Sequence, residues 1–116
     1  MNKKIKILHV VDSLGVGGME NGVVNIVNHI NPDIFESQII CLSAGGPFEE
    51  RVNHERTRIE VLNIDDGVKY RHIKRIKSYL LENEIDIIHT HNFATGLKGV
   101  LAARLAGTPV IIHGEH

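Results

Sequence analysis

The sequence predicts an α/β fold built on a parallel β-sheet. Five short apolar segments alternate along the chain with four segments of helical character, which is the pattern of repeated strand–helix–strand units. The first apolar segment leads directly into a glycine-rich turn and an amphipathic helix, all within residues 5–30. Three of the apolar segments end in titratable polar residues, and parallel strands bring such ends to one edge of a sheet.

The expected strands are short apolar runs, several of them rich in β-branched residues, which suit the interior of a parallel sheet. They are residues 5–11, 37–42, 59–64, 85–89 and 110–113. The expected helices are residues 19–30, 48–55, 70–83 and 95–106. Strand order 3-2-1-4-5 is expected, which gives a Rossmann-like three-layer α/β/α sandwich with its ligand edge beside the first and fourth strands. The whole chain, 1–116, is predicted to be a single domain.

The last expected helix carries its apolar residues at helical spacing. Leu97, Val100, Leu101 and Leu105 are expected to face the sheet. Gly107 is expected to end this helix in the left-handed conformation, with Pro109 soon after it.

Composition excludes several classes of protein. Thirteen Lys and Arg against fourteen Asp and Glu give a formal charge of -1, which argues against nucleic-acid binding. The single cysteine, Cys41, excludes an internal disulfide, fits a reducing cytoplasm, and is expected to be an inert thiol in a buried strand. No segment reaches the ~18 uncharged apolar residues that a membrane-spanning helix requires.

The glycine turn favours an anion-binding site. Gly15, Gly17 and Gly18 precede a helix N-terminus, where backbone N–H groups and the helix dipole attract phosphate. The dinucleotide-binding fingerprint is not met, because Glu20 stands where its third glycine belongs and no acid follows the second strand. Two structural alternatives stay open: the glycines serve only tight packing, and Glu20 only complements the helix dipole.

Histidines gather at the predicted ligand edge of the sheet. His89, His91, His113 and His116 follow the fourth and fifth strands, which is the main evidence for a site there. His89 and His91 have the spacing of a metal-binding pair, to which His113, Glu115 or Asp12 could add ligands. No carboxylate stands at a fixed local spacing, so a catalytic metal is the less favoured interpretation.

A separate expectation applies to each histidine. His89 closes a buried strand and is expected to satisfy a backbone group. His91 is expected in the loop beyond that strand, where a functional role is favoured. His9 is expected to be structural, and the remaining three are expected on the surface: His29, His54 and His72.

A basic segment, residues 69–77, holds five cations in nine positions. Most such helices present a solvated face. A minority bind anionic membrane surfaces, so a peripheral membrane contact stays open.

Three motifs together resemble a known family. They are ILHVVDSLGVGGMENGVVNIVNHI at 7–30, DIIHTHNF at 86–93 and GLKGVLAARLAGTPVIIHGEH at 96–116. They resemble the N-terminal domain of family-4 glycosyltransferases, most of all the sugar transferases of bacterial exopolysaccharide clusters. The resemblance implies half of a GT-B fold and the transfer of a sugar from a nucleotide-sugar donor to a glycan or lipid-linked acceptor, with retention of configuration. It also implies no cofactor and no metal.

The resemblance implies roles for individual residues as well. Gly17 and Gly18 would lie against the donor diphosphate and the acceptor, with Glu20 grouped as substrate-binding. His91, together with Asn92, would line the acceptor side of the cleft. His113 would be the catalytic-site histidine that hydrogen-bonds the transferred sugar near the reacting carbon.

One departure from the family pattern concerns the second domain, which holds the nucleotide and is missing from this sequence. We therefore expect a fragment that is inactive alone and that self-associates through uncovered apolar surface. A cytoplasmic location is expected, with a peripheral contact at the inner membrane face left open. Two other functions stay open: a non-catalytic anion-binding or interaction module, and a metal-dependent hydrolase built on the histidines.

Overall fold

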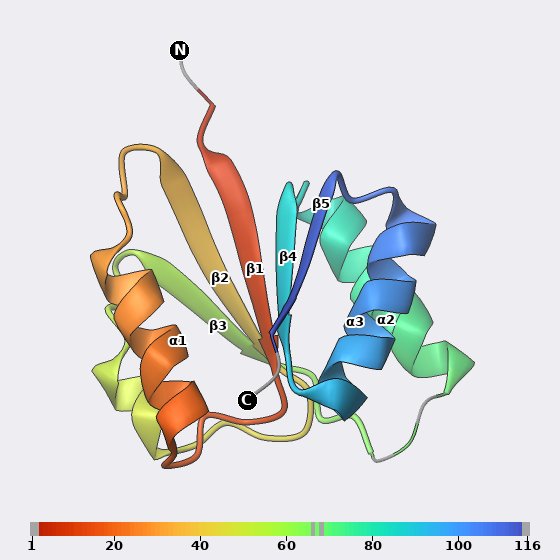
Figure 1. Cartoon of the computed structure of the whole chain (residues 1–116), viewed down its shortest axis with the longest axis horizontal. Coiled ribbons are helices and arrows are strands. Elements are labelled where there is room, and N and C mark those ends of the chain that lie inside the picture. Colours follow the sequence, from red (N-terminus) through yellow and green to blue (C-terminus); the bar gives the residue numbers. More distant parts are fainter. Residues whose placement is uncertain (1–2, 66, 68, 115–116) are drawn as a thin grey trace.

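The protein is a three-layer α/β/α sandwich in the computed structural model, which describes residues 3–65, 67 and 69–114 (Figure 1). The strands are β1 (Ile5–Val11), β2 (Phe35–Cys41), β3 (Thr57–Val61), β4 (Ile87–His91) and β5 (Val110–Gly114). The helices are α1 (Gly18–His29), α2 (Tyr70–Glu82), α3 (Phe93–Ala106) and the 3₁₀ helix η1 (Pro47–Arg51). All strand pairs are parallel and the order is β3-β2-β1-β4-β5, as the sequence predicted.

The side chains of β1 alternate between two separate cores, because successive strand residues point to opposite faces of the sheet. Leu8 and Val10 belong to the core under α2 and α3. Val11 belongs to the core under α1 and η1. Helices therefore cover both faces, α1 on one and the α2–α3 pair on the other (Figure 1).

A local signal ends α3 as expected, whereas two other elements differ from the predicted bounds. Gly107 adopts the left-handed conformation (φ 74°) after α3, and its N–H donates to the carbonyl of Arg104. The helix predicted over residues 48–55 is a shorter 3₁₀ helix, Pro47–Arg51. β4 continues to His91 rather than ending at His89, because its parallel pairing with β5 extends to His91 opposite Gly114.

The orientation of α3 differs from the prediction. Leu97, Leu101 and Leu105 are exposed, whereas Ala102 and Ala103 are completely buried. The glycine–alanine face of α3 lies against the sheet. A Cβ atom at Gly96 would collide with the ring of His113 on β5, and one at Gly99 with the methyl group of Thr90 on β4. Hydrophobic spacing identified the helix but could not distinguish a leucine face from an adjoining glycine–alanine face.

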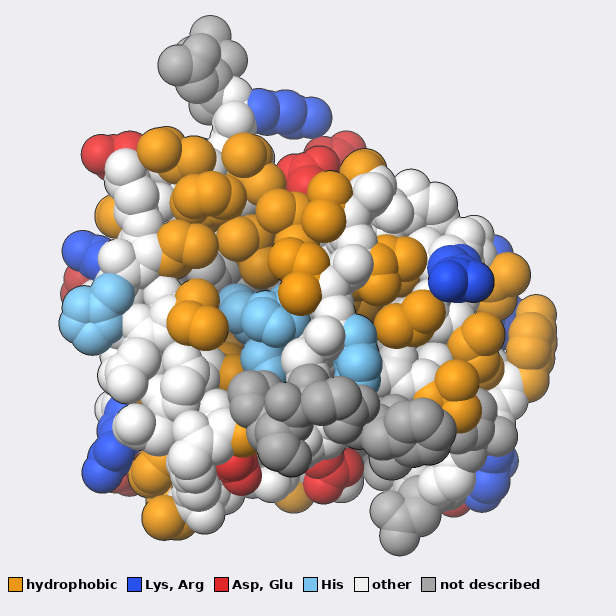
Figure 2. All heavy atoms as spheres, viewed as in Figure 1, with side chains coloured by type: hydrophobic (Ala, Val, Ile, Leu, Met, Phe, Trp, Pro, Cys, Tyr) orange, Lys and Arg blue, Asp and Glu red, His pale blue; other side chains and the backbone are white. Residues whose placement is uncertain are grey.

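The face that carries α1 is only partly covered by helices. Val110 and Ile112 of β5 are each 44% exposed, and Ile5 of β1 is 38% exposed. Figure 2 shows hydrophobic side chains gathered on this face, with a group of histidine side chains beside them. Among the described residues, no helix has the length and apolar character needed to cross a membrane.

Candidate functional site

The glycine turn after β1 rests on a second glycine turn after β2. Gly46 lies against the turn so closely that a Cβ atom there would be 2.7 Å from the Gly15 nitrogen and closer still to the Leu14 carbonyl. The Leu14 carbonyl also accepts a hydrogen bond from the Phe48 N–H at 3.0 Å. Residues 43–47 lie between the predicted strand 37–42 and the predicted helix 48–55, and the role of Gly46 was not predicted. The double glycine at 45–46 was the available signal.

Gly17 and Gly18 are open toward solvent at the start of α1. Gly17 has φ 179°, an extended conformation that any residue adopts. A Cβ atom at Gly18 would meet nothing within 4 Å, and one at Gly17 would meet only the movable carboxylate of Glu20. No side chain caps α1. The structure thus leaves Gly18 uncovered, whereas the Glu20 carboxylate would have to turn away from Gly17 to admit an anion.

His91 is a buried strand residue and not the loop residue that the sequence predicted. It is the last residue of β4 and is 2% exposed. Its ring stacks on His89 with centroids 4.2 Å apart, which confirms that the two histidines point the same way. His91 Nε2 also lies 3.3 Å from Nδ1 of His9 on β1.

His9 is the histidine that joins this pair, although the sequence prediction gave it a structural role. His9 is paired in register with His89 across β1 and β4 and is 2% exposed. Burial, followed by the charges of His89 and His91, lowers the pKa of His9 to about 3. His9 is therefore neutral at physiological pH. The expected strand order alone could have placed His9 beside His89.

The other residues considered as ligands lie elsewhere. Asp12 accepts a hydrogen bond from the Ser43 hydroxyl at 2.9 Å. His113 lies 2.7 Å from the Thr90 hydroxyl and, by strand alternation, on the sheet face opposite His91. Glu115 and His116 fall outside the described residues. The structure thus brings His89 and His91 together but separates them from His113.

The position of His113 depends on three residues of β4 and α3. The Thr90 hydroxyl is 2.7 Å from His113 Nδ1, and Thr90 is completely buried. Gly96 lies under the imidazole, and any Cβ atom there would collide with the ring. Gly99 meets the Thr90 methyl group in the same way. Sequence reasoning missed all three residues, although glycines three positions apart in a helix signal a close approach.

Asn92 holds a strained backbone conformation between β4 and α3. Its φ of 69° and ψ of 159° lie in a region occupied almost only by glycine, which costs of order 1–3 kcal/mol. Its N–H donates to the Gly114 carbonyl at 3.0 Å, and its carbonyl accepts from the Gly96 N–H at 2.8 Å. Asn92 is exposed. Strain of this kind, held by neighbouring elements at a ligand edge, favours a functional role.

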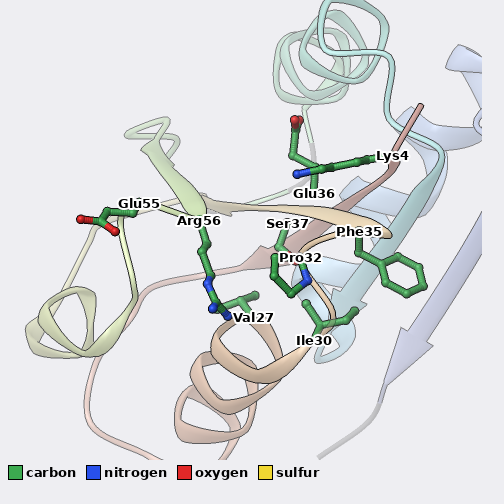
Figure 3. A pocket seen from close by; sticks show the side chains of 9 residues that line it. All are labelled: Lys4, Val27, Ile30, Pro32, Phe35, Glu36, Ser37, Glu55 and Arg56. Atoms are coloured by element: carbon green, nitrogen blue, oxygen red, sulfur yellow. The ribbon is translucent and has the colours of Figure 1, made fainter. Parts of the chain in front are cut away.

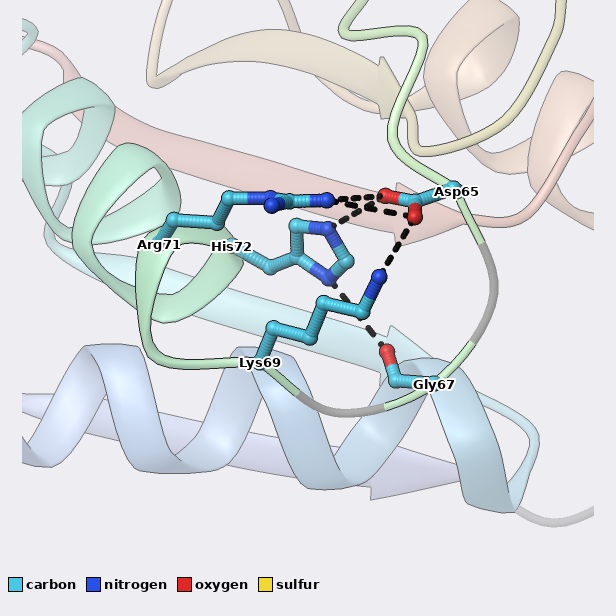
Figure 4. Close-up of polar contacts among 5 residues, drawn as sticks. All are labelled: Asp65, Gly67, Lys69, Arg71 and His72. Atoms are coloured by element: carbon cyan, nitrogen blue, oxygen red, sulfur yellow. Dashed lines mark hydrogen bonds and ion pairs between the residues drawn. The ribbon is translucent and has the colours of Figure 1, made fainter.

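A second polar cluster lies where β3 leads to α2 (Figure 4). Asp65 accepts hydrogen bonds from Lys69 (2.6 Å), Arg71 (3.2 Å) and His72 Nε2 (2.8 Å). The hydrogen bond from Lys69, then those from His72 and Arg71, hold the pKa of Asp65 well below its usual range. His72 is buried, so its predicted surface position was wrong, whereas His29 and His54 are exposed as predicted. Two of the five cations of residues 69–77 thus bind Asp65.

Two further features lie apart from these groups. A pocket at the amino-terminal edge of the sheet is lined by Val27, Ile30, Phe35, Arg56 and neighbouring residues (Figure 3). The pocket lies at the edge opposite the predicted site. Cys41 is buried, as predicted, and burial, followed by Glu49 and Asp12, raises its pKa to about 12.

Comparison with known proteins identifies a family and a relative. Residues 16–116 match the sequence profile of a family described as Glycosyltransferase Family 4. The chain is also 29% identical over 121 aligned positions to the UDP-Gal:alpha-D-GlcNAc-diphosphoundecaprenol alpha-1,3-galactosyltransferase of Escherichia coli. That alignment covers 99% of this chain and 30% of the relative, so the chain spans about a third of the relative's length.

Proposed function

Because the chain belongs to glycosyltransferase family 4, we propose that it forms the acceptor-side half of a retaining glycosyltransferase. In this proposal a hexose moves from a nucleotide-sugar donor to a lipid-linked or glycan acceptor. The family match over residues 16–116 carries the proposal. The name of the E. coli relative supports the substrate classes, since it specifies a UDP-sugar donor and a diphosphoundecaprenol-linked acceptor.

The turn at Gly17 and Gly18 is proposed to approach the donor diphosphate and the acceptor. Its support is the open space at Gly18, the movable carboxylate of Glu20 beside Gly17, and the N-terminus of α1, which no side chain caps. Backbone N–H groups there would stabilise negative charge that grows on the leaving diphosphate. Glu20 would turn outward and bind substrate hydroxyls.

His113 is proposed to hydrogen-bond the transferred sugar. Its support is geometric, because Thr90 and Gly96 fix the ring at the carboxyl end of β5. A ring held in one orientation loses little entropy when it positions a substrate. Asn92 is proposed to contact the acceptor, and buried His91 to position the end of β4 beneath it.

The location is proposed to be cytoplasmic, with a peripheral contact at the inner membrane face. A lipid-linked acceptor lies in a membrane, and exposed Lys74 and Arg75 of α2 would attract anionic lipid at about 1 kcal/mol each. The 116 residues alone are proposed to be inactive. A chain that spans 30% of its relative would lack most of the groups that bind and align the donor.

The test is a transfer assay on the product of the complete gene, with a panel of radiolabelled nucleotide sugars and a polyprenyl-diphosphate-linked acceptor. Transfer with the anomeric configuration retained, seen by NMR of the product, is expected. His113→Ala should lower kcat/KM by about 100-fold, whereas His54→Ala, an exposed histidine outside the site, should leave it unchanged. Full activity of His113→Ala would refute the role of His113.

The same experiment distinguishes sugar transfer from the alternative function, which is anion binding. If the complete gene product transfers no sugar but binds inorganic phosphate, and Gly18→Asp abolishes that binding, an anion-binding module replaces the transferase. If the 116-residue chain itself transfers sugar, its proposed inactivity is wrong.

A further inference from the structure

Three histidines from two adjacent strands form a compact cluster on the α1 face of the sheet. His9 lies opposite His89 in the β1–β4 register, and His91 follows two positions later on the same face of β4. The ring centroids lie 4.2–5.6 Å apart. The sugar-transfer proposal gives His9 and His89 no role, so the cluster needs its own explanation.

The nitrogen atoms are spaced as metal ligands require. One ring nitrogen from each histidine lies within 4.8 Å of the other two. His9 Nδ1 and His91 Nε2 are 3.3 Å apart. Two ligands of a tetrahedral zinc ion with bonds of about 2.0–2.1 Å are separated by roughly 3.3 Å. The Cβ–ring torsion of half-buried His89 is of a broad type, which lets its nitrogen approach the other two.

The chemistry of the cluster favours a transition metal. Imidazole binds metal in its neutral form, and His9 is 2% exposed, with the rings of His89 and His91 as its aromatic neighbours. The nitrogen of His9 that faces His91 is Nδ1, whereas its buried Nε2 has no hydrogen-bond partner among the described residues. The described fold therefore accounts for only one of the two nitrogen atoms of this ring. Among the described residues the set consists of imidazoles alone, which suits Zn²⁺, Ni²⁺ or Cu²⁺ and not Mg²⁺ or Ca²⁺.

We propose that His9, His89 and His91 bind a zinc ion through three imidazoles, with water as the fourth ligand. The ion would join the middle of β1 to the end of β4. It takes no part in the proposed sugar transfer, and the proposal stands or falls separately from that function.

The test uses the tag-free 116-residue chain, treated with a chelator and then titrated with ZnCl₂ by calorimetry. Binding of one zinc ion per chain is expected, together with a rise in Tm. His89→Gln should weaken zinc binding by at least about tenfold and remove the rise in Tm. The matched control, His54→Gln, changes an exposed histidine outside the cluster and should bind as the wild type does.

A second readout reports the ligand set. Cobalt(II) should give the intense visible absorption of a four-coordinate site in the wild type and lose it in His89→Gln. Circular dichroism establishes that each variant is folded. A folded wild-type chain that binds no stoichiometric zinc overturns the proposal, as does a folded His89→Gln variant with wild-type affinity.

Discussion

Two glycine pairs at the ligand edge of the sheet differ in what surrounds them. Gly17 and Gly18, where α1 begins, face open space or a movable carboxylate. Gly96 and Gly99 of α3 are covered by His113 and Thr90. The first pair leaves the backbone accessible to a ligand, whereas the second lets strand side chains occupy the place of a Cβ atom. The same residue type therefore leaves the backbone uncovered at one turn and makes room for strand side chains at the other.

The largest effect is expected at Gly96. Gly96→Ala should destabilise the chain by about 2 kcal/mol, because the new methyl group collides with the His113 ring and overpacking outweighs the better helix propensity of alanine. Gly22→Ala is the matched control, since Gly22 is a helical glycine of α1 with nothing within 4 Å of a Cβ atom. It should stabilise by about 0.5–1 kcal/mol. Urea denaturation measures the free energy of unfolding of both variants. Equal changes would show that the His113 ring does not restrict position 96.

Thr90→Val tests the side chain that lies against Gly99 and contacts His113. Valine keeps the shape of threonine but lacks the hydroxyl that lies 2.7 Å from His113 Nδ1. The free energy of unfolding is therefore expected to fall by about 1 kcal/mol. Urea denaturation measures the change in the free energy of unfolding. A folded Thr90→Val variant as stable as the wild type would show that the Thr90 hydroxyl does not hold the His113 ring.

Asn92→Gly tests the strained backbone conformation between β4 and α3. Glycine occupies φ 69° without penalty, and its greater freedom in the unfolded chain offsets part of the gain. The variant should be more stable by about 0.5–1 kcal/mol. Its thermal unfolding is compared with that of Asn63→Gly, a second non-glycine residue with positive φ (55°). A less stable Asn92→Gly would mean that the side chain, and not the backbone, matters at this position.

Gly18→Ala should have the smallest effect on stability. Its Cβ atom enters open space at the first position of α1, so the free energy of unfolding should change by less than about 0.5 kcal/mol. Sugar transfer by the complete gene product should nevertheless fall, because the methyl group obstructs the proposed approach of the diphosphate. A large loss of stability would place Gly18 with the covered pair instead.

The sheet was predictable because its signals are local. Strand and helix segments, their order, the left-handed cap at Gly107 and the burial of Cys41 follow from runs of a few residues or from one expected topology. The shared direction of His89 and His91 follows from strand alternation alone.

The site was less predictable because its contacts join distant segments. His9 meets His91 across 82 positions, and no local pattern shows that contact. The burial of His72 depends on Asp65, and the fit of His113 depends on which face α3 turns inward. The glycines determine the rotation of α3 about its own axis, whereas the prediction from sequence used the spacing of the leucines. The roles of Gly17, Gly18, Glu20, His91, Asn92 and His113 in sugar transfer stay predictions.

The central place of β1 has a consequence during synthesis. One edge of β1 pairs with β2, which follows closely, but the other pairs with β4, and the N–H of Lys6 reaches the carboxylate of Asp86 across 80 positions. At roughly 5–20 residues per second, the ribosome needs about 4–16 s to make that interval. During those seconds an apolar strand carries one unpaired edge outside the exit tunnel. Chaperones that bind extended apolar segments would meet this nascent chain first at residues 5–11.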